Sequence, residues 1–329
     1  MPADNRHMIR TIRYPALLAA VIGAAVALAL PAAATARSKC FGHRATIVGS
    51  NQRNHIKGTH HRDVIVGKGG NDELIGNGGR DIICGDSGND RIFAGKFPHQ
   101  SITKDDPTKL SGGPGNDLLE GGFNDDFMVG DNASFGGNAK GPVGKDDLEG
   151  EFGNDYEIGD NYSSGGNADG GRHDFIQAQK GADTIIGDSA VTGDGRARGG
   201  ANDHFASSSG HDFEVGDSYS PQGRAIGGGN DELNAGPGDD LAVGDSYTRT
   251  GFASGSGRDQ LHMQQQNDVA YGDNHAARSA GRVRGGKHDF IGGFSGIDHL
   301  HGGPRDDTCN GGSGHHDTAE QCEFVLEVP

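Results

Sequence analysis

The stretch Gly67-Lys68-Gly69-Gly70-Asn71-Asp72-Glu73-Leu74-Ile75 is one copy of a nine-residue repeat. Each copy begins with a glycine-rich turn, has Asp at the sixth place and has an apolar residue at the eighth. Adjoining copies fill residues 49–93 without a gap, and the earliest of them has Asn54 where Asp is expected. Most of the chain after residue 48 is a variation of this unit, so the fold is expected to follow from the repeat.

The apolar eighth residues indicate how the repeats pack. Successive side chains of a strand point to opposite faces, so the eighth residue of each short strand is expected to face inward. Two repeats then make one coil of 18 residues, and no repeat buries its apolar residue without neighbours. We therefore predict an all-β fold, a parallel β-roll or β-helix solenoid with Gly/Asp-rich turns. Its inward rows would contain Ile56, Ile65, Leu74, Ile83 and Ile92.

A longer repeat follows residue 112. A Gly-Asp-Asn or Gly-Asp-Ser triplet recurs every 28 or 29 residues, and two loop aspartates nine residues apart lie within each step. A further segment of ten or eleven residues carries a small apolar residue such as Ala139 or Ala168, which predicts a third strand and a wider coil. The first and the third residue after the second aspartate of a pair tend to be apolar. That alternation predicts that Glu157 and Glu214, in the middle places, point outward.

These periods divide the chain into segments. We expect a signal peptide at 1–36, an N-terminal cap at 37–48 and a nonapeptide β-roll at 49–93. A loop insertion is expected at 94–111, the wider solenoid with 28–29-residue coils at 112–308 and a C-terminal cap at 309–329, with Phe324, Val325 and Val328 covering the last coil.

The ends of the chain indicate export. Residues 1–36 combine a basic start, the apolar run Ala16 to Leu30 and the small-residue site Ala34-Thr35-Ala36, as in a secretory signal peptide. A membrane anchor is the alternative, but the run is short for a spanning helix. Four cysteines remain after such cleavage, which suggests disulfides in an oxidising compartment. Pairing Cys40 with Cys84, and Cys309 with Cys322, would staple both ends; free thiols are the alternative.

Composition shows that apolar burial alone does not stabilise this fold. The 329 residues include 60 Gly, and only 32% are hydrophobic, too little for an ordinary layered core. The formal charge is −17, and because residues 1–36 hold three Arg and one Asp, the remaining chain carries 26 basic and 45 acidic residues. Such an anion should not bind nucleic acid, and it should attract cations.

The loop aspartates are the candidate cation ligands. Coils of a parallel solenoid lie about 4.8 Å apart, so equivalent carboxylates would stack and repel by about 1 kcal/mol even in water. Calcium suits the gap because it accepts six to eight oxygen ligands, including backbone carbonyls, whereas magnesium demands stricter octahedral geometry. The predicted ligands are Asp63, Asp72, Asp81, Asp90, Asp117, Asp126, Asp146, Asp155, Asp174, Asp183, Asp203, Asp212, Asp231, Asp240, Asp259, Asp268, Asp289, Asp298 and Asp307. The triplet aspartates (Asp131, Asp160, Asp188, Asp217, Asp245 and Asp273) fit either a turn role or a metal role.

The repeat in residues 49–93 resembles the RTX, or haemolysin-type, calcium-binding nonapeptide repeat. The resemblance is close over those residues and stretched over 112–320. It implies that the sixth-position aspartates and turn carbonyls of successive coils share calcium ions, with Asn54 leaving the first site empty or weak. With a signal peptide, the chain resembles a stand-alone secreted calcium-binding repeat protein of bacteria.

Two functions remain open at this point. The first is a non-enzymatic extracellular repeat protein that folds on calcium binding and serves a structural, adhesive or surface role, with a cell-surface or extracellular polymer as partner and no membrane span after cleavage. The alternative is a calcium-using β-helix lyase or epimerase acting on polysaccharides. An enzyme would need a non-repeated cluster of catalytic groups, and the sequence has no G-x-S-x-G or H-E-x-x-H motif.

Overall fold

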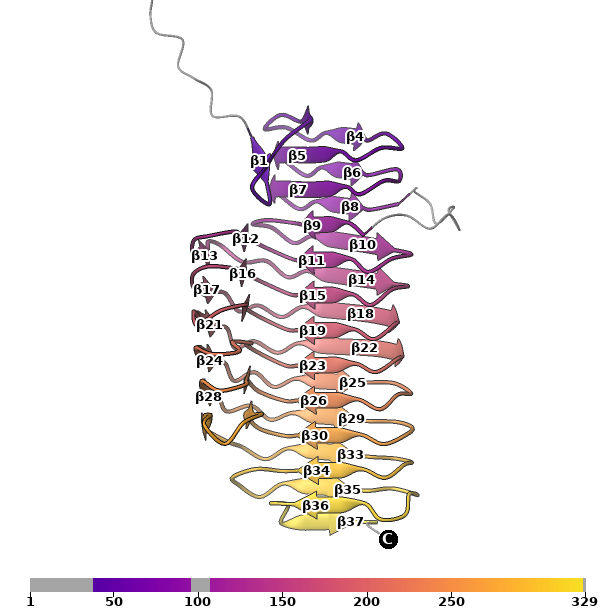
Figure 1. Ribbon diagram of the computed structural model, residues 1–329, viewed down its shortest axis with the longest axis vertical. Helices are drawn as coiled ribbons and strands as arrows, with labels where there is room; N and C mark the ends of the chain where they lie inside the picture. Colours follow the sequence, from indigo (N-terminus) through magenta and orange to yellow (C-terminus); the bar gives the residue numbers. More distant parts are fainter. Residues whose placement is uncertain (1–37, 96–106, 328–329) are drawn as a thin grey trace, which may run out of the picture. The chain divides into compact units, whose positions relative to one another are not determined.

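The computed structural model describes residues 38–95 and 107–327. The predicted signal peptide lies outside the described residues. From residue 38 onward the chain winds into one stack of parallel coils (Figure 1). The prediction of an all-β parallel solenoid is confirmed. No helix with the length and apolar character needed to cross a membrane occurs in these two ranges.

Two parallel sheets of twelve strands run the length of the stack. Sheet 1 contains, in spatial order, β3 (Ile47–Val48), β5 (Val64–Gly69), β7 (Ile82–Ser87), β9 (Lys109–Ser111), β11 (Phe127–Val129), β15 (Tyr156–Ile158), β19 (Thr184–Ile186), β23 (Phe213–Val215), β26 (Leu241–Val243), β30 (Val269–Tyr271), β34 (His299–His301) and β36 (Thr318–Glu320). Sheet 2 contains β4 (His55–Lys57), β6 (Glu73–Ile75), β8 (Arg91–Phe93), β10 (Leu118–Gly122), β14 (Asp147–Glu151), β18 (Phe175–Lys180), β22 (His204–Ser209), β25 (Glu232–Asn234), β29 (Gln260–His262), β33 (Phe290–Gly292), β35 (Thr308–Asn310) and β37 (Phe324–Leu326).

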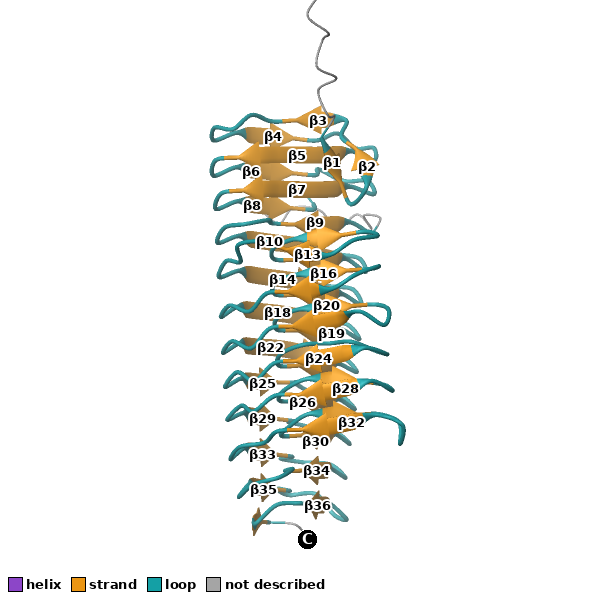
Figure 2. Cartoon of the chain, turned by 90° about the vertical axis from the view of Figure 1, so that its left-hand side faces the viewer, coloured by secondary structure: helices purple, strands orange, loops and turns teal. Residues whose placement is uncertain are grey.

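The 28–29-residue coils after residue 112, which we call the long coils, add a further face. Figure 2 turns this face toward the viewer. Sheet 3 holds the predicted third strands: β13 (Ala139–Lys140), β17 (Ala168–Asp169), β21 (Arg196–Arg198), β24 (Arg224–Ile226), β28 (Phe252–Ser254) and β32 (Arg282–Arg284). A second row, which the sequence did not indicate, precedes it: β12 (Ala133–Ser134), β16 (Tyr162–Ser163), β20 (Ala190–Val191), β27 (Tyr247–Thr248) and β31 (His275–Ala276). The extra segment thus supplies two short strands in most long coils.

The core between sheets 1 and 2 is a single file of apolar side chains. Ile65, Leu74, Ile83 and Ile92 are fully buried as predicted, and Ile56 packs against them at the end of the stack. In the long coils the inward residue stands two places after each loop aspartate in both sheets. Leu119 and Met128, in the two strands of one coil, follow this rule. One spacing rule therefore covers the whole solenoid.

The outward placement predicted for Glu157 and Glu214 is wrong. Both side chains are fully buried, because the middle place of a sheet 1 strand is the inward one and its apolar flanking residues face the added segment. Glu214 accepts a hydrogen bond of 2.7 Å from Ser207 Oγ, whereas no donor reaches either oxygen of Glu157. Burial raises the pKa of Glu157 well above its usual range and that of Glu214 to about 8. Both are expected to be neutral acids in the core.

The segments outside the main repeats also differ from prediction. The insertion proposed at 94–111 ends earlier, since β9 adds a regular strand to sheet 1 and Leu110 is fully buried; residues 96–106 lie outside the described residues. At the C-terminus, β36 and β37 extend both sheets instead of covering the last coil. Phe324 and Val325 are 60% and 48% exposed, and Val328 is not described.

Disulfides tie both ends of the stack, with the predicted pairing confirmed. Cys40 belongs to the short antiparallel pair β1 (Lys39–Cys40) and β2 (His43–Arg44), and bonds to Cys84 in β7. Cys309 in β35 bonds to Cys322, which stands between β36 and β37. Each bond joins a terminal element to the repeat array.

Candidate metal centre

The loop aspartates form two columns, one at each connection between sheets 1 and 2. The first-loop column precedes the strands of sheet 2 and comprises Asp72, Asp90, Asp117, Asp146, Asp174, Asp203, Asp231, Asp259, Asp289 and Asp307. The second-loop column precedes the strands of sheet 1 and comprises Asp63, Asp81, Asp126, Asp155, Asp183, Asp212, Asp240, Asp268, Asp298 and Asp317. All are buried. The structure thus brings the predicted residues together along two edges.

Hydrogen bonds hold each column in register. In the first-loop column the backbone N–H of Asp72 donates to Asp90 Oδ1 at 2.7 Å, and that of Asp117 donates to Asp146 Oδ1 at 2.8 Å. The second-loop column repeats the bond, for example from Asp155 N–H to Asp183 Oδ1 at 2.8 Å. One carboxylate oxygen per aspartate is therefore engaged with the neighbouring coil, and the other is left for a further partner.

In most coils no hydrogen-bond donor reaches that second oxygen. Buried acceptors are normally paired, because an unpaired one loses its hydration without compensation. A whole column of them indicates a partner that protein donors do not supply. The buried Oδ2 atoms without a donor belong to Asp72, Asp90, Asp117, Asp146, Asp155, Asp174, Asp183, Asp203, Asp212, Asp231, Asp240, Asp259, Asp268, Asp289, Asp298, Asp307 and Asp317.

Glycines leave the space beside these oxygens. A Cβ placed on Gly67 would lie 2.3 Å from Asp72 Oδ2 and 2.8 Å from the carbonyl oxygen of Gly85 in the next coil. On Gly159 it would lie 1.9 Å from the Gly187 carbonyl oxygen and 2.4 Å from Asp174 Oδ2. At both glycines a carboxylate oxygen therefore converges with a carbonyl oxygen of the next coil.

The electrostatics of the columns are unfavourable without a cation. Burial, with the charge of Asp146 next, raises the pKa of Asp117 to about 9. Burial also raises the pKa of Asp183 to about 7, with the charge of Asp212 adding to it. Burial and neighbouring like charges both disfavour ionisation, so the carboxylates need either protons or cations.

The first copies deviate from this pattern. Asp63 has both oxygens engaged, since the Thr59 N–H donates to Oδ2 at 2.7 Å and the Thr46 hydroxyl donates to Oδ1 at 3.5 Å. Asn54 is bound within its own loop, where its Oδ1 accepts the Ser50 N–H at 2.5 Å. Thr108 occupies the second-loop position between Asp81 and Asp126.

Two acidic residues at the C-terminal ends of the columns were not among the predicted ligands. Asp317 completes the second-loop column by accepting the Asp298 N–H at 3.0 Å. Glu323 accepts the Asp307 N–H at 2.9 Å and ends the first-loop column. The glycines of 311–314 signal the loop of Asp317, which stands ten rather than nine residues after Asp307.

The donor set fits a hard divalent cation. Carboxylate oxygens and glycine carbonyl oxygens are the ligands that calcium takes in proteins. Near the last long coil, carboxylate oxygens of Asp273, Asp289 and Asp307 lie within 4.8 Å of one another. The residues present therefore suit calcium.

Comparison with protein families agrees with this geometry. The model described as "RTX calcium-binding nonapeptide repeat (4 copies)" matches residues 58–92, 108–133, 168–190, 227–246 and 288–315. The chain contains RTX calcium-binding repeats. The matched segments lie in both the short coils and the long ones, between Gly58 and His315. No curated protein sequence matches the chain.

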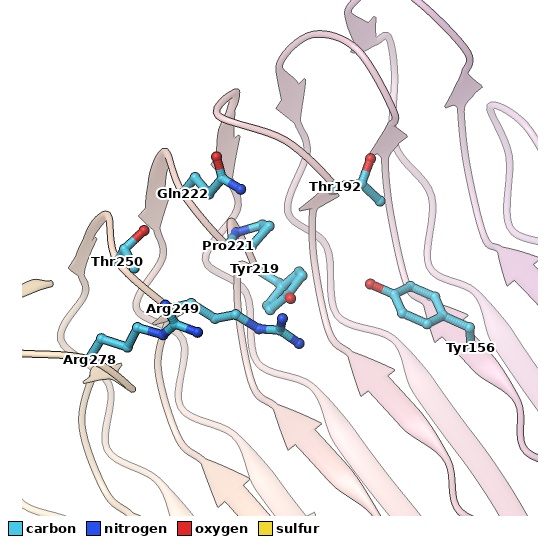
Figure 3. Close-up of a pocket in the computed structure, with 8 residues that line it drawn as sticks. All are labelled: Tyr156, Thr192, Tyr219, Pro221, Gln222, Arg249, Thr250 and Arg278. Atoms are coloured by element: carbon cyan, nitrogen blue, oxygen red, sulfur yellow. The ribbon is translucent and has the colours of Figure 1, made fainter. Parts of the chain in front are cut away.

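A separate cavity of about 390 Å³ opens on the added face of the long coils. Figure 3 shows Arg249 extending toward Tyr219, with Arg278 beside it. Burial raises the pKa of Tyr219 although the Arg249 guanidinium opposes this, so a tyrosinate base is disfavoured. The described lining holds neither carboxylate nor imidazole. It offers positive charge for an anion rather than groups for proton transfer.

Proposed function

We propose that this protein is an extracellular repeat protein whose solenoid folds when calcium fills its aspartate columns. The main observation behind this proposal is that most loop aspartates have a buried Oδ2 atom that no hydrogen-bond donor reaches. Each such oxygen belongs to a column of like-charged carboxylates, and in the first-loop column it lies beside a turn glycine, near a carbonyl oxygen of the next coil. A cation between them would remove the repulsion and supply the missing partner at once.

Calcium binding and folding would then be one equilibrium. The columns exist only when coils are stacked, because each site takes oxygens from successive coils. Binding free energy available only to the folded state stabilises that state. The predicted export signal would take the chain to a calcium-rich environment, where the fold forms. A structural, adhesive or surface role fits a protein of this kind, and an extracellular polymer remains the expected partner.

The ligands would be the carboxylates of the first-loop and second-loop columns together with the carbonyl oxygens of the turn glycines. Asp63 and Asn54 would contribute less, because hydrogen bonds within their own loops already engage their side chains. The earliest coil is therefore expected to be the weakest part of the array.

The test is far-UV circular dichroism of residues 37–329 during a calcium titration from a chelated start at pH 7.5. We expect a cooperative gain of β signal with calcium and none with magnesium at the same concentration. A full β spectrum in chelator at this pH would contradict the proposal. Equilibrium dialysis on the same samples should show several bound calcium ions per chain.

A further inference from the structure

The six triplet aspartates form a third column beside the first-loop column. Asp160 and Asp217 are among them, and all six are at most 4% exposed. Backbone bonds keep them in register, for example from Asp188 N–H to the Asp217 carbonyl oxygen at 3.1 Å. The column, which we call the triplet column, contains Asp131, Asp160, Asp188, Asp217, Asp245 and Asp273.

The triplet column stands where the extra segment enters the repeat turn. In a short coil, Gly67 is followed directly by the turn that ends at Asp72, and its Cβ position lies against Asp72 Oδ2. In a long coil, a Cβ on Gly216 would likewise lie 2.5 Å from Asp231 Oδ2. Asp231 nevertheless stands fourteen residues after Asp217, the residue that follows Gly216. The extra segment is thus an insertion inside a calcium-type turn. The turn carbonyl of the next coil is retained, because a Cβ on Gly216 would lie 1.9 Å from the Gly244 carbonyl oxygen.

One oxygen of each triplet aspartate closes the insertion. Asp217 Oδ1 accepts the N–H of Gly229 at 2.9 Å, where the chain returns to the turn. Asp160 Oδ2 accepts the Arg172 N–H in the same way at 2.9 Å. These hydrogen bonds explain how a triplet aspartate stabilises the turn.

The other oxygen has no donor. Asp217 Oδ2 and its equivalents in the other five long coils are buried and reached by no N–H or O–H group. Their closest polar surroundings are the carboxylates of adjoining aspartates. Burial, followed by the charges of Asp231 and Asp245, raises the pKa of Asp217 well above its usual range. The triplet side chain therefore adds a second carboxylate to each first-loop position.

The chain contains a natural comparison for the triplet. Gly85-Asp86-Ser87 is the same triplet in a short coil without an insertion, and there Asp86 is exposed with a backbone φ of 67°. The sequence Gly-Asp-Ser alone thus does not bury the carboxylate or direct it at a neighbour. Burial appears only where the insertion has opened the turn.

We propose that the triplet aspartates are additional calcium ligands on the first-loop edge of the long coils, beside the loop aspartates and the turn carbonyls. Each cation on the first-loop edge of a long coil then meets carboxylates from both columns, such as Asp217 and Asp231. On the second-loop edge, each position has a single column of aspartates. Since calcium affinity rises with the number of charged ligands, the first-loop sites of the long coils bind calcium more tightly than the second-loop sites.

The test compares Asp217→Asn with Asp86→Asn in the mature chain, resting on the calcium binding proposed above. The amide introduced by Asp217→Asn keeps an oxygen for the Gly229 N–H, so only charge and ligand strength change. We expect Asp217→Asn to lose about one bound calcium ion in equilibrium dialysis, or to weaken the tightest class of sites about tenfold. Asp86→Asn should match the wild type.

The outcomes separate the two proposals. If the wild type binds no calcium, the proposed function itself fails. If Asp231→Asn loses calcium while Asp217→Asn binds like the wild type, the triplet aspartates are only turn residues and this inference alone is overturned. Should Asp217→Asn fail to fold in saturating calcium, the same dialysis on Asp273→Asn, in the last long coil, decides the question.

Discussion

The buried glutamate Glu157 allows a quantitative test of the core. Its inward position corresponds to Met128 in the preceding coil, and no donor reaches either of its oxygens. Removing an unpaired buried polar group stabilises a protein by roughly 1–3 kcal/mol. With about 2–4 °C per kcal/mol for domains of 150–250 residues, Glu157→Met should raise the Tm by roughly 2–12 °C in saturating calcium.

Glu214→Met is the matched control. Ser207 donates to Glu214 Oε1 at 2.7 Å, and the residue equivalent to Ser207 near Glu157 is Gly150, which has no side chain. Replacing Glu214 would leave the buried Ser207 hydroxyl without an acceptor, at a cost of roughly 1–3 kcal/mol that offsets the gain. Thermal denaturation followed by circular dichroism should therefore separate the variants. Equal shifts, or a lower Tm for Glu157→Met, would refute the assignment of Glu157 as an unpaired core acid.

Other perturbations give further expectations. Gly159→Ala should lower both calcium affinity and Tm, because its Cβ would lie 1.9 Å from a carbonyl oxygen, whereas Gly193→Ala, with no atom within 4 Å, should leave both unchanged in the same titration. In chelator, protons should replace calcium. Burial raises the pKa of column carboxylates such as Asp90, to about 6, so their contribution to stability is complete below the unfolded value of 3.8 and is lost as pH rises through the folded pKa. Circular dichroism in chelator should therefore show β structure near pH 4 that disappears toward pH 8, and the reverse trend would contradict the burial of these groups. Replacing Cys40 and Cys84 by Ser should cost about 4 kcal/mol on the chain-entropy estimate for a 44-residue loop, measurable as a lower urea midpoint, and an unchanged midpoint would show that the bond does not constrain the unfolded chain.

Local periodicity predicted the parts of the fold that depend on one repeat and its neighbour. Leu74 and Asp72 stand at fixed places in a nine-residue unit, so their burial and stacking follow from the period alone. The same reasoning failed for Glu157, because apolar flanking residues suggested the wrong inward face. Those flanking residues pack against the added segment, so both faces of these sheet 1 strands are covered and alternation does not identify the inward face.

The candidate site was predictable to a similar extent. Aspartates at the repeat position were found from spacing, but Asp317 was missed because its loop is one residue longer. The sequence left the role of the triplet aspartates open, since the same triplet at Asp86 makes only an exposed turn. Their burial depends on how the insertion folds back onto the turn, which no local pattern encodes.

The two ends of the stack have a consequence for assembly. Sheet 2 begins with β4 and ends with β37, and both strands lack a neighbour on one side among the described residues. β4 exposes Lys57 while Glu323 and Glu327 flank β37, so opposite charges would meet if one molecule followed another along the axis. Such a head-to-tail contact does not close on itself. At high concentration and low salt, the calcium-loaded protein is therefore expected to grow into polar filaments whose length falls as ionic strength screens the junctions.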